Sequence, residues 1–374
     1  MTHLLVLISA LCALVVIYPY VIYPRILRLL PKRPVIPAPD HRASISMLFC
    51  AYNEEASMPE KLANIEALKA RHPDLEVLAF DDGSSDSTRK LLLDRPDLVR
   101  LEQGGGRNGK AHGMKRMAAL ATGDILVFTD ANVMLREDAL DNLTAWYADP
   151  QVGGVCGSLH YLGNDSSATA TVGSRYWQME EAIKAQESRT GNVMGADGSI
   201  FSLRRPLYPD FPDTVLDDLT VSMAAVFAGK RLLKVEDVVA YERLVSERSD
   251  EIARKIRIAA RAYHTHLFLR PQLQQMAALD RFKYASRKLV RWFGGGFLVI
   301  GAVTGLAAAV SVHPLLGLAA LIGLFSLVLL GWRQSTGPLA SLAEIVLALM
   351  ATQRGVIRAM RGQVYQVWTP AKSR

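Results

Sequence analysis

Short apolar runs alternate with stretches of helical period in the middle of the chain. The strand-length runs occupy residues 44–50, 75–80, 99–102 and 125–132. Helices are expected in the intervals, at about 57–71 and 111–121. Strands and helices in alternation predict an α/β fold with a mostly parallel sheet and right-handed crossovers. Because ligands bind at the carboxyl ends of strands in such sheets, the polar residues after each run are the candidate site.

A longer apolar segment stands at the beginning of the chain. Residues 4–23 carry no charge, and about 20 such residues are enough to cross a bilayer as a helix. Basic residues follow directly, so the positive-inside rule predicts an outer N-terminus and a cytoplasmic domain after it. A cleavable signal peptide is disfavoured, because a basic first region is absent and Tyr and Pro stand where small residues are needed.

Two more apolar segments lie near the other end, at residues 294–312 and 315–332, and they predict a transmembrane hairpin whose tip lies outside. Residues 339–351 are apolar but only about 13 long and contain Glu344, so an interfacial helix is expected there. Residues 246–288 are expected to form basic amphipathic helices at the membrane surface.

Composition fits a membrane-associated protein whose apolar segments have basic flanks. Half of the 374 residues are hydrophobic, and the net charge of +7 is explained by basic residues that face anionic lipid. Aromatic and basic residues do not interleave as in nucleic-acid-binding proteins, and three distant cysteines predict neither a disulfide framework nor a zinc site. The predicted regions are an anchor (1–24), a linker (25–42), an α/β domain (43–245), membrane-surface helices (246–288), a hairpin with an interfacial helix (289–352) and a basic cytoplasmic tail (353–374).

The run ILVFTDAN, residues 125–132, ends in two side chains suited to a hard cation. Side chains at positions i and i+2 of an extended segment point the same way, so Asp130 and Asn132 can face one ion while Ala131 turns aside. Their oxygen atoms are the ligand type that Mg²⁺ prefers. Asp and Asn are also common in ordinary turns after a strand, which is the alternative for this pair taken alone.

The polar clusters after the other strands suit a nucleotide and its phosphates. Asn53, Glu54 and Asp82 offer acceptors for base and ribose edges. Arg107 and Lys110 lie in GGGRNGK, a Gly-rich run before a helix start, where N–H groups and the helix dipole favour phosphate. Helix caps and a solvated basic surface are the alternatives. Neither GxxxxGK[ST] nor a dinucleotide-binding glycine fingerprint is present, so an ATPase and a dehydrogenase are both poorly supported.

Four motifs, AYNEE, DDGSSDST, NGKAHGM and GDILVFTDAN, follow one another between residues 51 and 132. In this order and at these intervals they resemble the membrane-associated family 2 glycosyltransferases of the exopolysaccharide type, and weaker similarity continues to about residue 261. The resemblance implies the GT-A fold of nucleotide-diphospho-sugar transferases: a Rossmann-like, mostly parallel sheet, here with N- and C-terminal transmembrane helices.

The resemblance also implies a UDP-sugar or similar nucleotide-sugar donor, Mg²⁺ or Mn²⁺ as cofactor, and inversion at the anomeric carbon. By it, Asp82 contacts the nucleotide and Asp130 belongs to a DxD-type metal motif. Asn132 stands where the family often has a second Asp; its carbonyl oxygen still ligates but adds no charge, so a lower metal affinity is expected. The expected metal ligands are Asp130 and Asn132. The expected donor site comprises Ala51, Asn53, Glu54, Asp82, Arg107, Lys110 and Asp130.

Two later stretches resemble the acceptor half of the family. GADGSIFSLRR, residues 195–205, is similar to the acceptor loop, with an ordinary glycine turn as the alternative. LDDLTVSMAAVFAGKR, residues 216–231, resembles the TED segment, and by that match Asp218 is the catalytic base. Asp217 could take this role by position alone, or both could charge a helix N-terminus. The expected acceptor-site residues are Gly195, Asp197, Gly198, Asp217, Arg254 and Arg257.

RKIRIAAR, residues 254–261, occupies the place where processive members have QxxRW. Arg257 matches the arginine, but Ile258 replaces the tryptophan, which weakens a polymer-synthase interpretation. We therefore expect an enzyme of the inner membrane that adds single sugars to a lipid-linked or oligosaccharide acceptor in cell-surface polysaccharide synthesis, with polysaccharide-assembly proteins as candidate partners. The alternatives are a processive β-polysaccharide synthase, a non-catalytic nucleotide-sugar sensor or assembly scaffold, and a polyprenyl phosphate glycosyltransferase.

Overall fold

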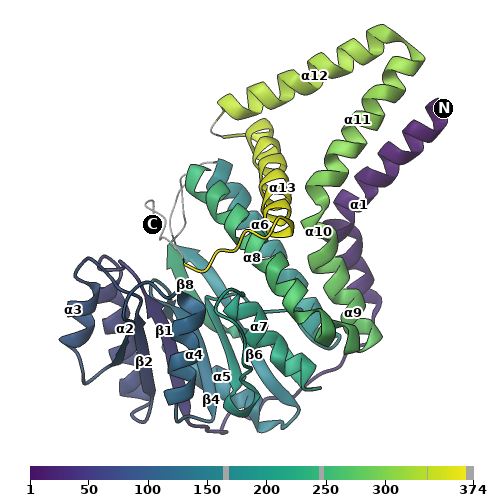
Figure 1. The fold of residues 1–374 in the computed structure, drawn as a ribbon. Helices are drawn as coiled ribbons and strands as arrows, with labels where there is room; N and C mark the ends of the chain where they lie inside the picture. Colours follow the sequence, from purple (N-terminus) through teal and green to yellow (C-terminus); the bar gives the residue numbers. More distant parts are fainter. Residues whose placement is uncertain (163–167, 244–247, 335, 368–374) are drawn as a thin grey trace.

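The computed structural model describes residues 1–162, 168–243, 248–334 and 336–367, which are arranged around an eight-stranded sheet (Figure 1). The strand order is β3-β2-β1-β4-β7-β6-β8-β5. β1 to β4 run parallel to one another, β6 and β8 are parallel, and β7 is antiparallel to both of its neighbours. The strands are β1 (Ile45–Ala51), β2 (Glu76–Asp81), β3 (Arg100–Gln103), β4 (Ile125–Asp130), β5 (Met134–Leu135), β6 (Val152–Leu162), β7 (Ile200–Arg204) and β8 (Arg231–Arg243). The predicted mostly parallel α/β fold is confirmed.

Helices cover both faces of this sheet (Figure 1). Those of the sheet domain are α2 (Met58–Arg71), α3 (Thr88–Leu93), α4 (Lys110–Leu120), α5 (Ala139–Thr144), α6 (Ala168–Arg189), α7 (Asp217–Phe227) and α8 (Arg248–Gln275). A short series leads to the apolar helices: α9 (Ala278–Tyr284), a π-helical turn η3 (Ala285–Leu289) and α10 (Val290–Trp292). The apolar helices are α1 (Thr2–Leu29), α11 (Gly294–Val312), α12 (Pro314–Arg333) and α13 (Pro338–Met360).

The continuous apolar runs of the sequence are explained by burial on both faces of the sheet. Leu48, Phe80 and Phe128 belong to one core cluster, which also contains residues of α4, α7 and α8. Phe49 and Val127, their neighbours along β1 and β4, belong to the cluster on the other face, with α2 and α5. A strand that is buried on both faces needs no polar alternation, so each polar residue at a strand end stands out.

Four helices, α1, α11, α12 and α13, are long and apolar enough to cross a membrane, and the protein is a membrane protein. α1 and α11 lie side by side and lead away from the sheet domain (Figure 1). Small residues allow their close approach: Ser9 Oγ donates to Gly301 O over 2.9 Å, and a Cβ at Gly301 would lie 3.1 Å from that of Cys12. Small residues at such contacts are usual between helices in lipid.

The structure corrects the predicted boundaries at both ends. α1 continues to Leu29, so the predicted linker at 25–42 begins only after that residue. The interfacial helix expected at 339–351 is the first part of α13, which has 23 residues and is itself a candidate span. Residues 353–360, expected in a basic tail, belong to this helix.

α8 differs from the membrane-surface helix predicted for this part of the chain. Its residues Ala262, Leu269 and Leu273 are buried in the same cluster as Leu219 of α7. α8 also packs along α13, where a Cβ at Gly355 would lie 2.4 Å from Ile256 O. α8 is therefore part of the domain core and joins the domain to the last helix.

The glycine at 355 gives a test of this joint. In Gly355→Leu the new side chain meets backbone that cannot turn aside, so we expect a loss of about 1–3 kcal/mol of stability through overpacking. Thermal unfolding of the detergent-solubilised chain measures it. Gly323→Leu on α12 is the matched control, because a Cβ there meets nothing within 4 Å. Equal melting temperatures for the two variants would contradict the described packing of α13 on α8.

Candidate active site

The register of the parallel strands brings the polar clusters of the sequence to one edge. Cys50 pairs with Asp130, and Ala51 pairs with Asp81, so β1, β2 and β4 end at the same level. The loop after β1 is then bonded to the loop after β2. Asn53 Oδ1 accepts from Ser85 N over 2.8 Å, and Asp82 N donates to Ala51 O over 3.0 Å.

Further hydrogen bonds between the two loops hold Asn53 and Glu54 in place. Asn53 has a positive φ of 52°, and its N–H donates to Ser84 Oγ over 3.1 Å. Glu54 N donates to Thr88 Oγ1 over 2.8 Å. These contacts fix the shape of the edge at which a nucleotide is predicted to bind.

Asp82 is fully buried and fastens the Gly-rich loop to the end of β2. Its Oδ1 accepts from Asn108 N over 2.6 Å and from Gly109 N over 2.9 Å, and its Oδ2 accepts from Arg107 Nε over 3.2 Å. The guanidinium of Arg107 lies over the ring of Tyr52, 3.3 Å from its centroid, a cation–π arrangement. Asp82, the carboxylate predicted to contact the nucleotide, thus fixes the conformation of the Gly-rich loop by accepting hydrogen bonds from two of its N–H groups.

The C-terminal segment also touches this loop, which sequence reasoning missed. Gln366 Nε2 donates to Asn108 O over 3.1 Å, and a Cβ at Gly109 would lie 2.4 Å from Gln366 O. Gly109 also has a positive φ of 92°, a conformation that suits glycine. The residues after α13 therefore lie directly against the Gly-rich loop.

Lys110 joins the donor side to the predicted acceptor side. Its Nζ lies 2.6 Å from Asp130 Oδ1 and 3.7 Å from Asp217 Oδ2. A Cβ at Gly198 would lie 2.9 Å from the same Nζ and 3.5 Å from Asp130 Oδ2, so the acceptor loop also packs here. Burial opposes its charge, but the carboxylates of Asp130, Asp217 and Asp218 outweigh that effect and raise the pKa of Lys110. Three segments far apart in sequence meet at this ammonium group.

Asp217 and Asp218 form the first turn of α7, and the structure gives them different surroundings. Asp217 is buried and faces Lys110, whereas Asp218 is partly exposed and its Oδ1 accepts from Leu219 N over 2.6 Å. Burial and the charge of Asp217 raise the pKa of Asp218 to about 6, against the opposing charge of Lys110. A carboxylate with such a pKa is ionised at neutral pH and is a better base than an ordinary aspartate.

One of the two predicted metal ligands, Asn132, has a neighbour that the sequence did not indicate. Asn132 Nδ2 donates to Glu242 Oε1 at the end of β8 over 3.0 Å, which directs its carbonyl oxygen to the other side. In the described part of the chain no group of three or more His, Cys, Asp and Glu side chains could hold a metal ion. The donor set of Asp130 and Asn132 fits a hard cation that also takes phosphate oxygens from a ligand, as Mg²⁺ commonly does.

The remaining predicted acceptor residues serve different parts of the domain. Lys184 Nζ donates to Asp197 Oδ2 over 2.6 Å, and although burial opposes ionisation, this ammonium and Ser199 hold the pKa of Asp197 at about 2. Arg254 on α8 donates to Tyr161 on β6, and Arg257 is half-buried on the same helix. Asp197 and Arg254 are thus bonded to residues outside the group around Lys110.

Comparison with known proteins gives relatives of this chain in sequence and in fold. Residues 46–211 match the family described as Glycosyl transferase family 2. Poly-β-1,6-N-acetyl-D-glucosamine synthase of Staphylococcus aureus is 27% identical over 230 residues, which cover 58% of this chain and 54% of that protein. The same synthase of Staphylococcus epidermidis is 24% identical over 189 residues, which cover 48% of this chain and 44% of that protein. The chain thus spans about half the length of these curated relatives.

Among solved structures, a mannosyltransferase from Pyrobaculum calidifontis, in complex with GDP-mannose and Mn²⁺, is similar in fold. The superposition has a TM-score of 0.74 and covers 96% of this chain and 99% of that chain, at 23% sequence identity. The likeness includes the apolar helices, because nearly the whole chain is covered. It shows a shared fold of the GT-A type.

The contacts of Asp82 predict how the Gly-rich loop responds to its loss. In Asp82→Asn one oxygen becomes an amide that cannot accept from Arg107, so we expect the loop to open more often and trypsin to cleave after Arg107 about tenfold faster. Timed proteolysis with mass mapping measures this. Asp97→Asn is the control, since the Asp97 side chain pairs with the neighbouring Arg95 at the surface, away from the Gly-rich loop. Unchanged cleavage after Arg107 would contradict this role of Asp82.

Proposed function

We infer that this member of glycosyl transferase family 2, a nucleotide-sugar glycosyltransferase, moves a sugar from a UDP-sugar to a membrane-associated acceptor, with inversion at the anomeric carbon. One observation carries the proposal. Asp218, with its raised pKa, belongs to the same group of charges as Lys110 and Asp130, which lie beside the Gly-rich loop. A base and a phosphate-binding cation in one site suit the transfer of a sugar to a hydroxyl.

The donor half of the reaction is assigned to the edge formed by β1, β2 and β4. The start of α4 and the ammonium of Lys110 would bind the diphosphate, since both favour negative charge. Asp130 and Asn132 would hold Mg²⁺ or Mn²⁺, which neutralises charge on the diphosphate when bound. Ala51, Asn53, Glu54 and Asp82 shape the nucleotide side of this edge, and the solved mannosyltransferase of the same fold was captured with GDP-mannose and Mn²⁺.

The acceptor half is assigned to Asp218. Its carboxylate takes the proton from the acceptor hydroxyl while that oxygen forms a bond to C1 of the sugar. The bond between C1 and the diphosphate oxygen breaks, and the nucleoside diphosphate leaves with the electron pair. Attack from the face opposite the leaving group inverts the configuration. Gly195 and Gly198 let the backbone of the acceptor loop approach the acceptor closely, because neither position carries a side chain.

We propose single addition as the mode of transfer and a cytoplasmic position for the domain. Ile258, at the place of the tryptophan of processive members, is exposed on α8, so an aromatic platform for a growing chain is missing at that position. Polymer synthesis is the second candidate, because the curated relatives are named as poly-β-1,6-N-acetyl-D-glucosamine synthases. The basic residues after α1 and before α11 favour a cytoplasmic domain.

Loss of Asp218 separates catalysis from binding. We expect Asp218→Asn to lower the rate of sugar transfer by about 10²- to 10⁴-fold, the contribution of general base catalysis, with UDP affinity retained. Released UDP is measured across a panel of nucleotide sugars, and UDP binding by calorimetry. Asp210→Asn, which changes an exposed aspartate before α7, is the matched control. Full turnover in Asp218→Asn would remove Asp218 as the base and favour a phosphate acceptor that needs no base.

The pKa of Asp218 predicts the acid limb of the pH profile. Below about pH 6 the carboxyl is protonated and cannot accept the proton of the hydroxyl, so kcat/KM should fall about tenfold per pH unit there. Lys110→Met removes a charge that lowers this pKa, so its limb should lie at higher pH. Steady-state rates between pH 4.5 and 8.5, about the range in which such groups titrate, measure both profiles. A limb that stays in place in Lys110→Met would contradict the coupling.

Product length decides between single addition and polymerisation. With a radiolabelled nucleotide sugar and membranes that contain the protein, we expect one sugar on a lipid-extractable product, because Ile258 offers no stacking platform. Gel filtration and thin-layer chromatography of the extract measure the product. Ile258→Trp serves as the comparison, and its product should lengthen if the aromatic side chain is what a processive enzyme uses. Long polymer from the unchanged protein would overturn single addition.

A further inference from the structure

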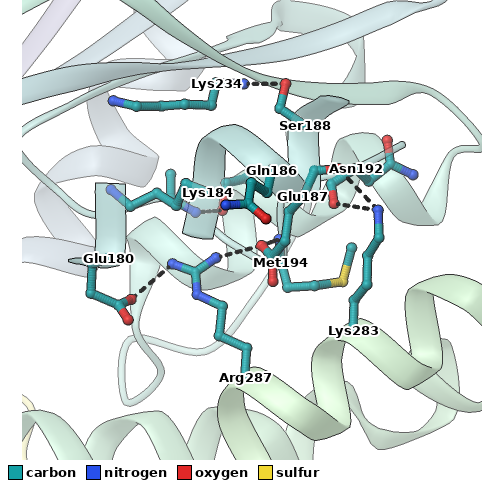
Figure 2. A network of polar contacts seen from close by, with 12 residues as sticks. Glu180, Lys184, Gln186, Glu187, Ser188, Asn192, Met194, Lys234, Lys283 and Arg287 are labelled. Carbon is teal, nitrogen blue, oxygen red and sulfur yellow. Dashed lines mark hydrogen bonds and ion pairs between the residues drawn. The ribbon is translucent and has the colours of Figure 1, made fainter. Parts of the chain in front are cut away.

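A cluster of charges joins the sheet domain to the apolar helices. Glu180 and Glu187 of α6 face basic residues of η3 and α10. Figure 2 shows both glutamates with Arg287 of η3. Arg287 lies 2.8 Å from Glu187 Oε2 and 3.2 Å from Glu180 Oε2, and Arg291 pairs with Glu180 Oε1. Glu187 Oε1 accepts from Tyr23 of α1 over 2.6 Å. Both carboxylates are therefore already taken by two arginines.

Lys288, next to Arg287 in η3, is a basic residue that the two glutamates of this cluster do not pair with. Within residues 1–162, 168–243, 248–334 and 336–367 its Nζ has no hydrogen-bond or ion-pair partner. Burial and the charge of Arg287 lower its pKa to about 8, against the charges of Glu180, Asp218 and Glu187. Lys288 is partly buried, so its ammonium loses part of its hydration without a pairing charge in return. The nearby carboxylates that could pair with it are engaged or lie in the group around Lys110.

The position of Lys288 points to the acceptor side of the site. Its Nζ would lie 3.9 Å from a Cβ at Gly195, and the same Cβ would lie 2.6 Å from Leu219 Cδ1. Both distances are measured from the same Cβ position at Gly195, so the Lys288 ammonium lies close to Leu219, the residue after Asp218. Gly195 belongs to the loop predicted to bind the acceptor. Lys288 is thus close to the place where the acceptor hydroxyl would meet its base.

A second cation lies near Asp218 from another direction. Arg261 of α8 donates from Nη2 to Val215 O over 2.8 Å, and its charge acts on Asp218. Its Nε is buried, and the described part of the chain offers it no hydrogen-bond partner. Two cationic groups with unused donors therefore come from different helices to the surroundings of one carboxylate.

We propose that Lys288 binds a phosphate or diphosphate group that the acceptor carries close to its reacting hydroxyl, and that the charge of Arg261, which also acts on Asp218, adds to the attraction. This inference rests on the proposed function, since it places the anion on the acceptor. A charge-assisted hydrogen bond to phosphate satisfies the ammonium that the protein leaves unpaired. The anion would lie where η3 and α10 lead into α11 (Figure 1), at the level where the headgroup of a lipid-linked acceptor enters.

The test is a binding comparison on the full chain in detergent. Saturating UDP first occupies the Gly-rich loop, which would also attract phosphate. Inorganic pyrophosphate, farnesyl diphosphate and neutral farnesol are then titrated by calorimetry. Lys288→Met removes the charge and keeps a stem of similar length, and we expect it to weaken farnesyl diphosphate binding about 10- to 100-fold, the value of one charged hydrogen bond. Lys288→Arg should restore most of the affinity, because it restores the donor.

The controls separate the sources of the anion and the two proposals. Arg281→Met removes an exposed charge of α9 near the same surface and should leave the affinity unchanged. Lys288-dependent binding of pyrophosphate as tight as that of farnesyl diphosphate supports a site for a free phosphate group, whereas tighter binding of farnesyl diphosphate supports a lipid acceptor. Wild-type affinity in Lys288→Met, or an equal loss in Arg281→Met, overturns the inference. If the protein turns over no nucleotide sugar, the proposed function is wrong. The binding comparison between Lys288→Met and Arg281→Met still tests the anion site, because it does not depend on turnover.

Discussion

One partly buried ammonium group holds the candidate site together. Lys110 stands at the start of α4 among Asp130 from β4 and Asp217 and Asp218 from α7. Without it, three carboxylates from distant segments would repel one another in a poorly hydrated space. With it, they are held close, the acceptor loop packs against the same atoms through Gly198, and Asp218 keeps a pKa at which it is ionised at neutral pH. The geometry that the reaction requires is thus a consequence of where one lysine is buried.

A second buried network fixes the domain against its membrane helices. Glu180 and Glu187 of α6 bind Arg287 (Figure 2). Arg291 also binds Glu180, and Tyr23 brings α1 into the same cluster. Buried ion pairs are not efficient sources of stability, because desolvation offsets most of their attraction. They are specific, however: loss of one partner leaves an uncompensated charge, so few other arrangements compete. The position of the sheet domain against the apolar helices is therefore set by directional contacts in addition to apolar packing.

The parts of the site that the sequence predicts are those with local signals. Asp130 and Lys110 could be predicted because they stand at the end of a strand and the start of a helix. The register of Cys50 with Asp130 then places the ends of β1 and β4 at one edge of the sheet. Glu242, Arg261 and Lys288 carry no such signal, because their neighbours come from segments more than 40 residues away along the chain. The length of α13 was also missed, since Glu344 interrupts its apolar pattern while the fold buries that residue.

Asn132 shows how such long-range contacts change the meaning of a motif. In isolation, its replacement of the expected aspartate looks like a loss of metal affinity. In the fold, its amide donates to Glu242 across 3.0 Å. An aspartate in this place would set two carboxylates against each other, which raises the pKa of one of them and turns a donor contact into repulsion. Asparagine keeps a carbonyl oxygen and donates its amide to Glu242, so a carboxylate of β8 lies next to position 132. The asparagine is therefore explained by its neighbour in the fold, and its presence is no evidence by itself for a non-catalytic protein.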